Sequence, residues 1–474
     1  MFVQIATLAF FAGILGLFVL NRDRTVTTSK ALWIPVVWLW IAGSRPVSMW
    51  LADFGFANLV PTTSDAYVDG SPLDRAVFLG LMILGLIVLV RKGWKVGPLL
   101  RANGPLLLFF FYCAVSVSWS DYPQVAFKRW IKIIGDVVMV LIVVTENDVP
   151  AAVKRMFSRV GFLLIPSSIL LIKFYGNLGR EYRPDFGNWA QSYIGVATIK
   201  NLLGMITLIC GVGALWCLLE ELRRPKETRR TGPLIAQCTL LAMVVWLLAV
   251  VNSATSMSCF IIASLILVIT SLRWVVRMPV FIHLLVIGVL SVSSFAVFFD
   301  TSGGLVGTVG RESTLTGRTD IWRLVLGMTA NPLVGTGFES FWLGSRLEKM
   351  WSIYWWHPNE AHNGYLEVYL TLGWIGIALF AVFLIAGYRN IIAGFRRDPD
   401  IARLKLAFFV IVLIYNFTES AIRETNPIWI MLLLAIVAVP VVSFPVEVPY
   451  PRNFAERELS GAHPAPVGLR RENI

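Results

Sequence analysis

The chain has 474 residues, of which 57% are hydrophobic and only 15% are charged, and its mean hydropathy is +0.71. Soluble domains hold about 25% charged residues, so this composition excludes a soluble protein of several domains. The formal net charge of +12 does not indicate a nucleic-acid partner, because Lys and Arg in membrane proteins gather in cytoplasmic loops and at anionic headgroups. We expect an all-α polytopic membrane protein.

Runs of about 20 apolar residues recur along the chain, and each is a candidate membrane-spanning helix. The first run has no basic segment before it and no cleavage pattern of small residues after it, so we expect a retained span and not a signal peptide. The pattern predicts about 12–13 spans, depending on whether the short second run crosses the membrane. They lie near residues 3–20, 31–43, 76–90, 105–119, 130–145, 157–173, 195–219, 233–251, 255–271, 279–299, 362–388, 406–421 and 428–443.

Charge differs between the two sets of connecting loops. One set holds about twice as many Lys and Arg residues as the other, so by the positive-inside rule it faces the cytoplasm. With thirteen spans, the N-terminus lies outside and the C-terminus inside. We expect a transmembrane domain over 1–443 and a disordered cytoplasmic tail over 444–474, which is rich in proline and charge.

Common signatures of nucleotide and metal chemistry are absent from the sequence. It contains no phosphate-binding P-loop and no H-E-x-x-H motif, and the predicted outer loops lack a D-x-D pair. The five cysteines lie in or beside apolar runs without metal-ligand spacing, which predicts free thiols. We therefore expect a reaction that uses neither a metal nor a cofactor.

The segment 300–361 is the longest predicted loop on the outer side, and loops of this length commonly carry function. Its second half mixes charged residues with many aromatic ones. That mixture fits a helix lying in the membrane interface with its aromatic face toward lipid, or an ordinary aromatic belt. The aromatic residues are Phe338, Phe341, Trp342, Trp351, Tyr354, Trp355 and Trp356.

His362 is the main candidate for proton transfer, because it stands where the long loop meets the eleventh span and imidazole titrates near neutral pH. The alternative is a capping or interfacial histidine. If the span begins at His362, helical spacing places Tyr365 on the same flank. Asn363 lies between them and is a further candidate for substrate binding.

Several cationic side chains on the outer side are candidates for binding phosphate. Arg311 and Arg318 frame the early part of the long loop, and a guanidinium group binds phosphate oxygens in a bidentate manner. The alternative for each is a solvated surface arginine. Lys200, near the start of the seventh span, either faces an outer cavity or extends back to the surface. Arg180 and Arg183 belong to a shorter outer loop.

A carboxylate, Glu419, stands near the outer end of the twelfth span. Arg423 follows it by four residues, which in a helix favours an ion pair between the two side chains. Two interpretations of Glu419 are open at this point: a partner in a structural ion pair, or a residue of the functional site.

Several short strings, taken in order, resemble those of the superfamily of O-antigen ligases and Wzy-type polymerases, closest to its exopolysaccharide-polymerase branch. The resemblance covers about residues 105–440 and includes the long outer loop between the tenth and eleventh spans. The strings are Trp119-Ser120-Asp121 with Lys128-Arg129, Lys200-Asn201, Gly317-Arg318 with Trp322, Asn331-Pro332 with Gly335 and Gly337, His362-Asn363-Gly364 with Gly373 and Gly376, and Asn416 with Glu419-Ser420.

The resemblance implies a membrane glycosyltransferase with a GT-C-like fold in the bacterial inner membrane. Such enzymes move glycan from undecaprenyl pyrophosphate to an acceptor sugar on the periplasmic face. It implies that Arg318 binds pyrophosphate and that His362 is the acid/base or leaving-group residue. The implied partners are a lipid-linked donor, a glycan acceptor and membrane lipids, with a flippase and a chain-length regulator nearby.

One departure from the family pattern shifts the expectation. Ligases of this kind carry a Ser-Arg pair where this chain has 252–256 (NSATS), so Lys200, Arg180 or Arg183 must supply the second positive charge, or the phosphate site is weaker. The missing arginine favours a polymerase of O-antigen or exopolysaccharide repeat units. The alternatives are a ligase that joins polysaccharide to lipid A core, and a flippase for lipid-linked oligosaccharide.

The chemistry of such a transfer sets what the residues must do. Pyrophosphate leaves as an anion, so the main requirement is positive charge aimed at it. A neutral His362 takes the proton of the acceptor hydroxyl, and a single displacement inverts the anomeric centre. Because the lipid tail stays in the bilayer, the donor enters sideways, and we expect Trp355 and Trp356 to cover that opening.

Overall fold

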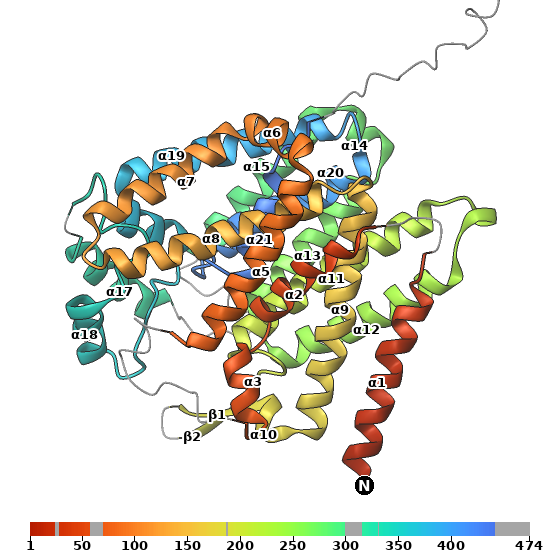
Figure 1. Ribbon diagram of the computed structural model, residues 1–474, viewed down its shortest axis with the longest axis horizontal. Coiled ribbons are helices and arrows are strands. Elements are labelled where there is room, and N and C mark those ends of the chain that lie inside the picture. Colours follow the sequence, from red (N-terminus) through yellow and green to blue (C-terminus); the bar gives the residue numbers. More distant parts are fainter. Residues whose placement is uncertain (24–27, 57–69, 186–187, 299–314, 330, 441–474) are drawn as a thin grey trace, which may run out of the picture. The chain divides into compact units, whose positions relative to one another are not determined.

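The computed structural model describes residues 1–23, 28–56, 70–185, 188–298, 315–329 and 331–440, and it is almost entirely helical (Figure 1). The helices are α1 (Phe2–Leu20), η1 (Lys30–Leu32), α2 (Trp33–Ala42), α3 (Val47–Asp53), α5 (Pro72–Arg91), α6 (Gly93–Ala102), α7 (Gly104–Ser116), η2 (Val117–Trp119), α8 (Pro123–Val144), α9 (Val149–Phe174), α10 (Gly176–Gly179), α11 (Lys200–Arg223), η3 (Lys226–Thr228), α12 (Thr231–Val251), α13 (Ala254–Ile269), α14 (Arg273–Arg277), α15 (Pro279–Phe298), α17 (Leu315–Gly327), α18 (Gly344–Ile353), α19 (Gly364–Gly394), α20 (Pro399–Tyr415) and α21 (Pro427–Ile436). Two strands, β1 (Arg180–Asp185) and β2 (Asn188–Tyr193), form an antiparallel hairpin.

The expected all-α polytopic membrane protein is confirmed. In the described part, six helices are long and apolar enough to cross a membrane, or seven if α6 and α7, which meet at 86°, count as one broken span. Four shorter apolar helices lie near 30–42, 254–269, 279–295 and 427–436. Each of the predicted spans overlaps a helix, but α8 and α20 are not among these apolar helices, and the count of 12 to 13 crossings stays a prediction. The predicted domain boundary at 443 and the tail lie outside the described residues.

Helix starts follow local sequence signals. Four of the long helices begin at a Ser, Asp or Asn whose side chain accepts a hydrogen bond from the first turn, with Pro in one of the first two helical positions. Proline fits there because its missing N–H has no intrahelical partner at a helix start. All five cysteines are free thiols, as expected from the sequence.

Helices α11, α13 and α19 start at one end of the bundle, around the segment that follows α20. Asn201 Nδ2 donates to Glu419 at 3.3 Å, and the Thr255 and Thr418 hydroxyls lie 3.1 Å apart. We call this the His362 end.

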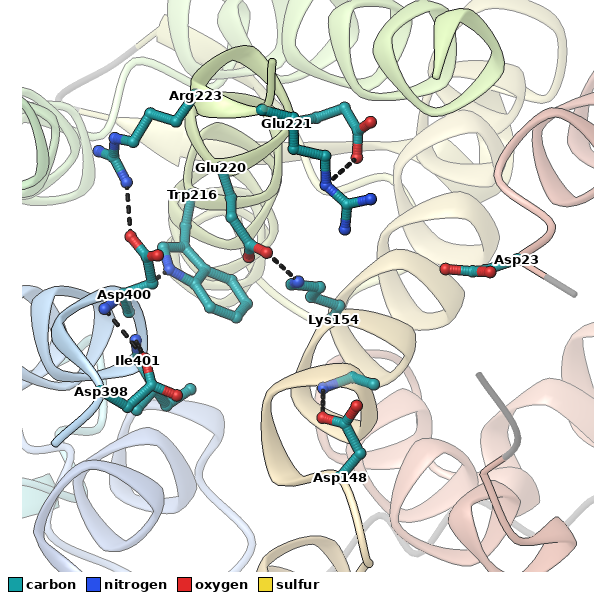
Figure 2. A network of polar contacts seen from close by, with 12 residues as sticks. Asp23, Asp148, Lys154, Trp216, Glu220, Glu221, Arg223, Asp398, Asp400 and Ile401 are labelled. Atoms are coloured by element: carbon teal, nitrogen blue, oxygen red, sulfur yellow. Dashed lines mark hydrogen bonds and ion pairs between the residues drawn. The ribbon is translucent and has the colours of Figure 1, made fainter. Parts of the chain in front are cut away.

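The opposite end of the same helices is held by ion pairs, which Figure 2 shows. Arg223, the last residue of α11, lies 2.8 Å from the Asp400 carboxylate at the start of α20. The indole of Trp216 donates to the Asp400 carbonyl at 2.8 Å, and Lys154 pairs with Glu220. We call this the Asp400 end.

Helix α19 is broken within its apolar stretch, at Gly373 (φ 65°, ψ −165°). The long loop fills the break: Trp374 N donates to Pro332 O at 2.9 Å, and Ile375 N donates to Leu333 O at 3.1 Å. A Cβ on Gly373 would lie 2.3 Å from the Leu333 carbonyl carbon, so only glycine fits. Non-helical backbone inside a membrane protein needs such partners, and the loop is thereby fixed onto α19.

The described part of the long loop folds over its own small hydrophobic cluster. Its buried members are Ile321, Val325, Phe341, Met350, Ala361 and Leu370, the last of which comes from α19. Helix α18 turns Leu347 and Met350 inward, while Glu348 and Lys349 are exposed. Leu347 and Met350 of α18 therefore pack inside this cap, by which we mean residues 315–329 and 331–361, while Ile353 is exposed. The expectation of an interfacial helix stays a prediction.

Candidate active site

Five charged side chains from three segments meet at the His362 end. Arg318 comes from α17, Glu360 and His362 come from the end of the cap, and Glu419 and Arg423 come from the segment after α20. We call these five residues the His362 cluster. Glycine and asparagine residues next to these side chains allow the start of α19 and the segment after α20 to pack closely.

The start of α19 fixes His362. Asn363 caps the helix, since its side chain accepts hydrogen bonds from Tyr365 N at 3.1 Å and Leu366 N at 3.0 Å. Gly364 N donates to Asn416 O at 3.0 Å, and a Cβ on this glycine would lie 2.0 Å from the Asn416 side-chain oxygen. The His-Asn-Gly string thus positions the imidazole beside the end of α20.

Backbone strain gathers around the cluster. Five described residues other than glycine have a left-handed backbone, and all except Asn252 belong to the cap, to the residues next to it or to the segment after α20. They include His362 (φ 51°) and His357 (φ 50°). Such conformations cost of order 1–3 kcal/mol each and persist where the surrounding structure imposes them, often at functional sites.

Within the cluster, each cationic side chain lies next to a carboxylate. His362 Nδ1 lies 2.9 Å from Glu360 Oε1 and 3.6 Å from Glu419 Oε2. Arg318 lies 3.8 Å from Glu419 Oε1 and donates to the carbonyl of Thr418 at 2.8 Å.

The second guanidinium group of the cluster belongs to Arg423. Arg423 lies 3.4 Å from the Oε2 of Glu360, so each carboxylate of the cluster faces one arginine and the histidine. With His362 protonated the cluster has three cations and two carboxylates. It is therefore net positive, as a site for an anion should be.

Protonation of His362 follows from its neighbours. Burial by itself lowers the pKa of this imidazole, but the contacts with Glu360 and Glu419 outweigh burial and raise the pKa to about 9. Burial by itself raises the pKa of Glu360, but the hydrogen bond from His362 and the positive charge of its ring lower this pKa by more. The raised pKa of His362 favours a protonated imidazole at neutral pH in the unliganded protein, whereas the sequence predicts a neutral base.

Three donor atoms of the cluster could in principle hold a metal ion. One ligand atom each from Glu360, His362 and Glu419 lie within 4.8 Å of one another. Both carboxylates, however, already face a guanidinium group. The arrangement therefore supplies positive charge to an anion through side chains.

The cap is tied down directly next to His362. The Trp322 indole, one turn after Arg318, donates to Ala361 O at 2.8 Å, while Ala361 N donates to the Glu367 carboxylate at 2.5 Å. Glu367 also accepts from the indole of Trp342 at 2.8 Å. These contacts hold Arg318 and His362 in one fixed relation.

The other predicted cationic residues lie at different places. Lys200 is the exposed first residue of α11 and not a residue inside the span, and its neighbour Asn201 contacts Glu419. Arg180 is held away from the cluster, since its Nε donates to Ile172 O at 2.9 Å. Arg311 lies outside the described residues, as does the side chain of Arg183.

Two further predictions need correction. Glu419 and Arg423 do not form an ion pair along a helix, because α20 ends at Tyr415; Arg423 instead pairs with Glu360. Tyr365 does not share a helix flank with His362, which precedes α19, and its hydroxyl donates to Leu413 O at 2.9 Å.

Glu360 was missed by the sequence reasoning, although it stands only two residues before His362. Its partner Arg423 comes from a different segment, so no local spacing marks Glu360. The segment 252–256, where ligases carry Ser-Arg, lies against the cluster through the Thr255–Thr418 contact. Arg318 binds the carbonyl of the same Thr418.

Comparison with known proteins agrees with this arrangement. A family model described as "O-Antigen ligase" matches residues 238–381, which include Arg318 and His362. The chain is also 26% identical over 314 residues to the exopolysaccharide production protein ExoQ of Rhizobium meliloti (strain 1021), covering 62% of this chain and 67% of that protein. The function is accordingly of the O-antigen ligase or polymerase type, in the synthesis of O-antigen or exopolysaccharide. The chain is therefore similar to the superfamily of O-antigen ligases and polymerases.

Proposed function

We propose that this protein is an inverting glycosyltransferase that polymerises O-antigen or exopolysaccharide repeat units from undecaprenyl pyrophosphate donors. The observation that carries the proposal is the meeting of Arg318, His362 and Glu419 at one end of a bundle of apolar helices. A lipid-linked donor presents its pyrophosphate at that depth while its tail stays in the bilayer.

The His362 end faces the periplasm in this proposal, and the membrane is the bacterial inner membrane. Support comes from the opposite end, where the cations Lys154, Arg223, Arg224, Arg230 and Arg403 gather. Lys and Arg concentrate on the cytoplasmic side of membrane proteins. Glycan built on the outer face needs no nucleotide, because the lipid pyrophosphate already activates the sugar.

Arg318, Arg423 and protonated His362 bind the pyrophosphate and stabilise the charge that develops as it leaves. They do so without a metal. Arg423 supplies the second guanidinium of the cluster, and Lys200 adds positive charge at the rim. Preorganised charge of this kind is worth about two to three orders of magnitude in rate for each donor removed.

The acceptor hydroxyl attacks the anomeric carbon while the bond to the pyrophosphate oxygen breaks. Its proton passes to a carboxylate of the cluster, Glu360 or Glu419, because the protonated His362 has no free lone pair, and the pyrophosphate leaves as an anion. Asn363 and Tyr365 position this group and do not contact the sugar. A single displacement of this kind inverts the anomeric configuration.

Purified protein in lipid nanodiscs, supplied with lipid-linked repeat units, tests the proposal. We expect longer glycans on the carrier with no nucleotide, no ion gradient and a chelator present, and inverted anomeric configuration by NMR. Retained configuration would contradict the single displacement. Growth of glycan only after lipid A core is added would identify a ligase, which the description of the matching family model favours.

A further inference from the structure

The tryptophans of the cap divide into two groups. Trp322, Trp342 and Trp351 are partly buried, and each donates its indole N–H within the protein. The acceptors are Ala361 O at 2.8 Å, the Glu367 carboxylate at 2.8 Å and Pro358 O at 3.1 Å. These three rings hold the cap together.

Trp355 and Trp356 differ from those three. Their side chains are 69% and 43% exposed, although they are among the largest apolar residues in the cap. They occupy the centre of a turn that is closed by a hydrogen bond from His357 N to Tyr354 O at 3.1 Å. Large exposed apolar rings at a fixed place commonly mark a binding surface.

The turn is rigid at its base and lies beside the His362 cluster. Trp351 stacks on His357 with ring centroids 4.8 Å apart and an interplanar angle of 23°. The Trp356 ring lies 6.1 Å from the His362 ring at an angle of 31°. An occupant of the Trp356 face therefore sits next to the reacting groups.

The surroundings of the two indoles indicate a polar occupant with one apolar face. The neighbouring helix α18 exposes Ser345, Glu348, Lys349 and Ser352, and its one large exposed apolar residue is Ile353. Acyl chains packed here would leave these polar groups without hydrogen-bond partners. A pyranose ring has a C–H face that packs on an indole and hydroxyl groups that bond to such side chains.

We propose that Trp356, with Trp355 beside it, is a stacking platform for a pyranose ring of the glycan next to the bond that forms. This inference rests on the proposed function and names the sugar subsite of the same cluster. It replaces the expectation that the two tryptophans cover a lateral opening for lipid. The platform orients the sugar so that its reacting group points at His362.

Saturation-transfer difference NMR tests the platform without requiring the reaction. The probe is the repeat-unit oligosaccharide released from its carrier by mild acid, with the protein in nanodiscs. We expect saturation of ring C–H protons with the wild type and about tenfold weaker binding with Trp356→Ala. Trp356→Phe retains a ring and keeps most of the binding. Trp274→Ala, which removes an equally exposed indole (54%) from α14, leaves binding unchanged.

The outcomes separate this inference from the proposed function. Loss of binding in Trp356→Ala but not in Trp356→Phe or Trp274→Ala supports the platform. Unchanged binding in Trp356→Ala, or no saturation with the wild type, overturns it. Arg318→Ala should bind the phosphate-free oligosaccharide normally and yet lose transfer. If Arg318→Ala transfers glycan normally the proposed function fails, whatever the NMR shows.

Discussion

The two ends of the helix bundle use charge in different ways. At the Asp400 end, ion pairs such as Arg223–Asp400 and Lys154–Glu220 join neighbouring helices at partly exposed positions (Figure 2). At the His362 end, Arg318, Glu419 and His362 converge from separate segments with side chains that are only 9–22% exposed. Partly exposed pairs contribute little and tolerate change, whereas buried groups of mixed charge need every partner.

The difference teaches where to look for chemistry in a protein rich in cations. A count of Lys and Arg draws attention to the Asp400 end, yet the proposed reaction site is at the His362 end. What distinguishes the His362 end is convergence and strain: a left-handed histidine, a capped helix start and a glycine against Asn416.

Arginine substitutions at the two ends sharpen the comparison most. We expect Arg318→Ala to lower glycan transfer by about 10²–10³-fold, because it removes charge aimed at the leaving pyrophosphate. Arg223→Ala, the matched control, should stay within about twofold of wild type, since a partly exposed ion pair contributes about 0–1 kcal/mol. The measurement is the rate of glycan extension by equal amounts of folded protein. Equal losses in both variants would break the comparison.

Stability should depend on pH through His362. The folded pKa of about 9 lies above the ordinary value of 6.5, so the contribution is fully present below pH 6.5 and is lost as pH rises through 9. The shift corresponds to on the order of 3 kcal/mol.

Thermal unfolding of nanodisc-held protein between pH 6 and pH 10 measures this contribution. The difference between wild type and His362→Gln should be largest at the acid end of this range and should shrink toward pH 10. A difference that is constant with pH would show that His362 is not charged by its neighbours.

The break in α19 gives a third comparison, between a strained glycine and a relaxed one. Gly373→Ala places a Cβ in a left-handed conformation and against Leu333, so we expect a loss of at least about 1–3 kcal/mol in stability together with lost activity. Gly288→Ala in α15 has nothing within 4 Å and should change stability little. Melting temperatures of the two variants check this. An equally stable Gly373→Ala protein would mean that the loop does not fix the break.

The smallest expected effect is that of a chelator. Arg318 and Arg423 already neutralise the carboxylates of Glu419 and Glu360, so transfer should be unchanged in EDTA. Activity that falls in EDTA and returns with a divalent cation would instead assign Glu360, His362 and Glu419 as metal ligands.

Much of the fold could be predicted from the sequence, because apolar runs of sufficient length have few alternatives to helix in a membrane. Helix ends could be predicted less well. The His362 string looks continuous with α19 but precedes it, since Asn363 supplies the cap. Gly373 interrupts the helix within an apolar run that hydropathy predicts as one continuous span.

The site was predicted in part. Arg318 and His362 stand out because their residue types suit phosphate and proton chemistry, and the structure brings both to Glu419. The roles of Glu360 and Arg423 could not be predicted, because they depend on a contact between two irregular segments. Trp355 and Trp356 look like any aromatic cluster until the folding of the cap shows which rings stay exposed.

The central claim is that this protein polymerises repeat units on the outer face of the membrane. The most direct test is the length and sidedness of glycan on the lipid pyrophosphate carrier in cells that lack the protein. The account predicts accumulation of single repeat units on the outer face. Full-length chains stranded on the carrier, or single units held on the cytoplasmic face, would contradict it and indicate a ligase or a flippase, respectively.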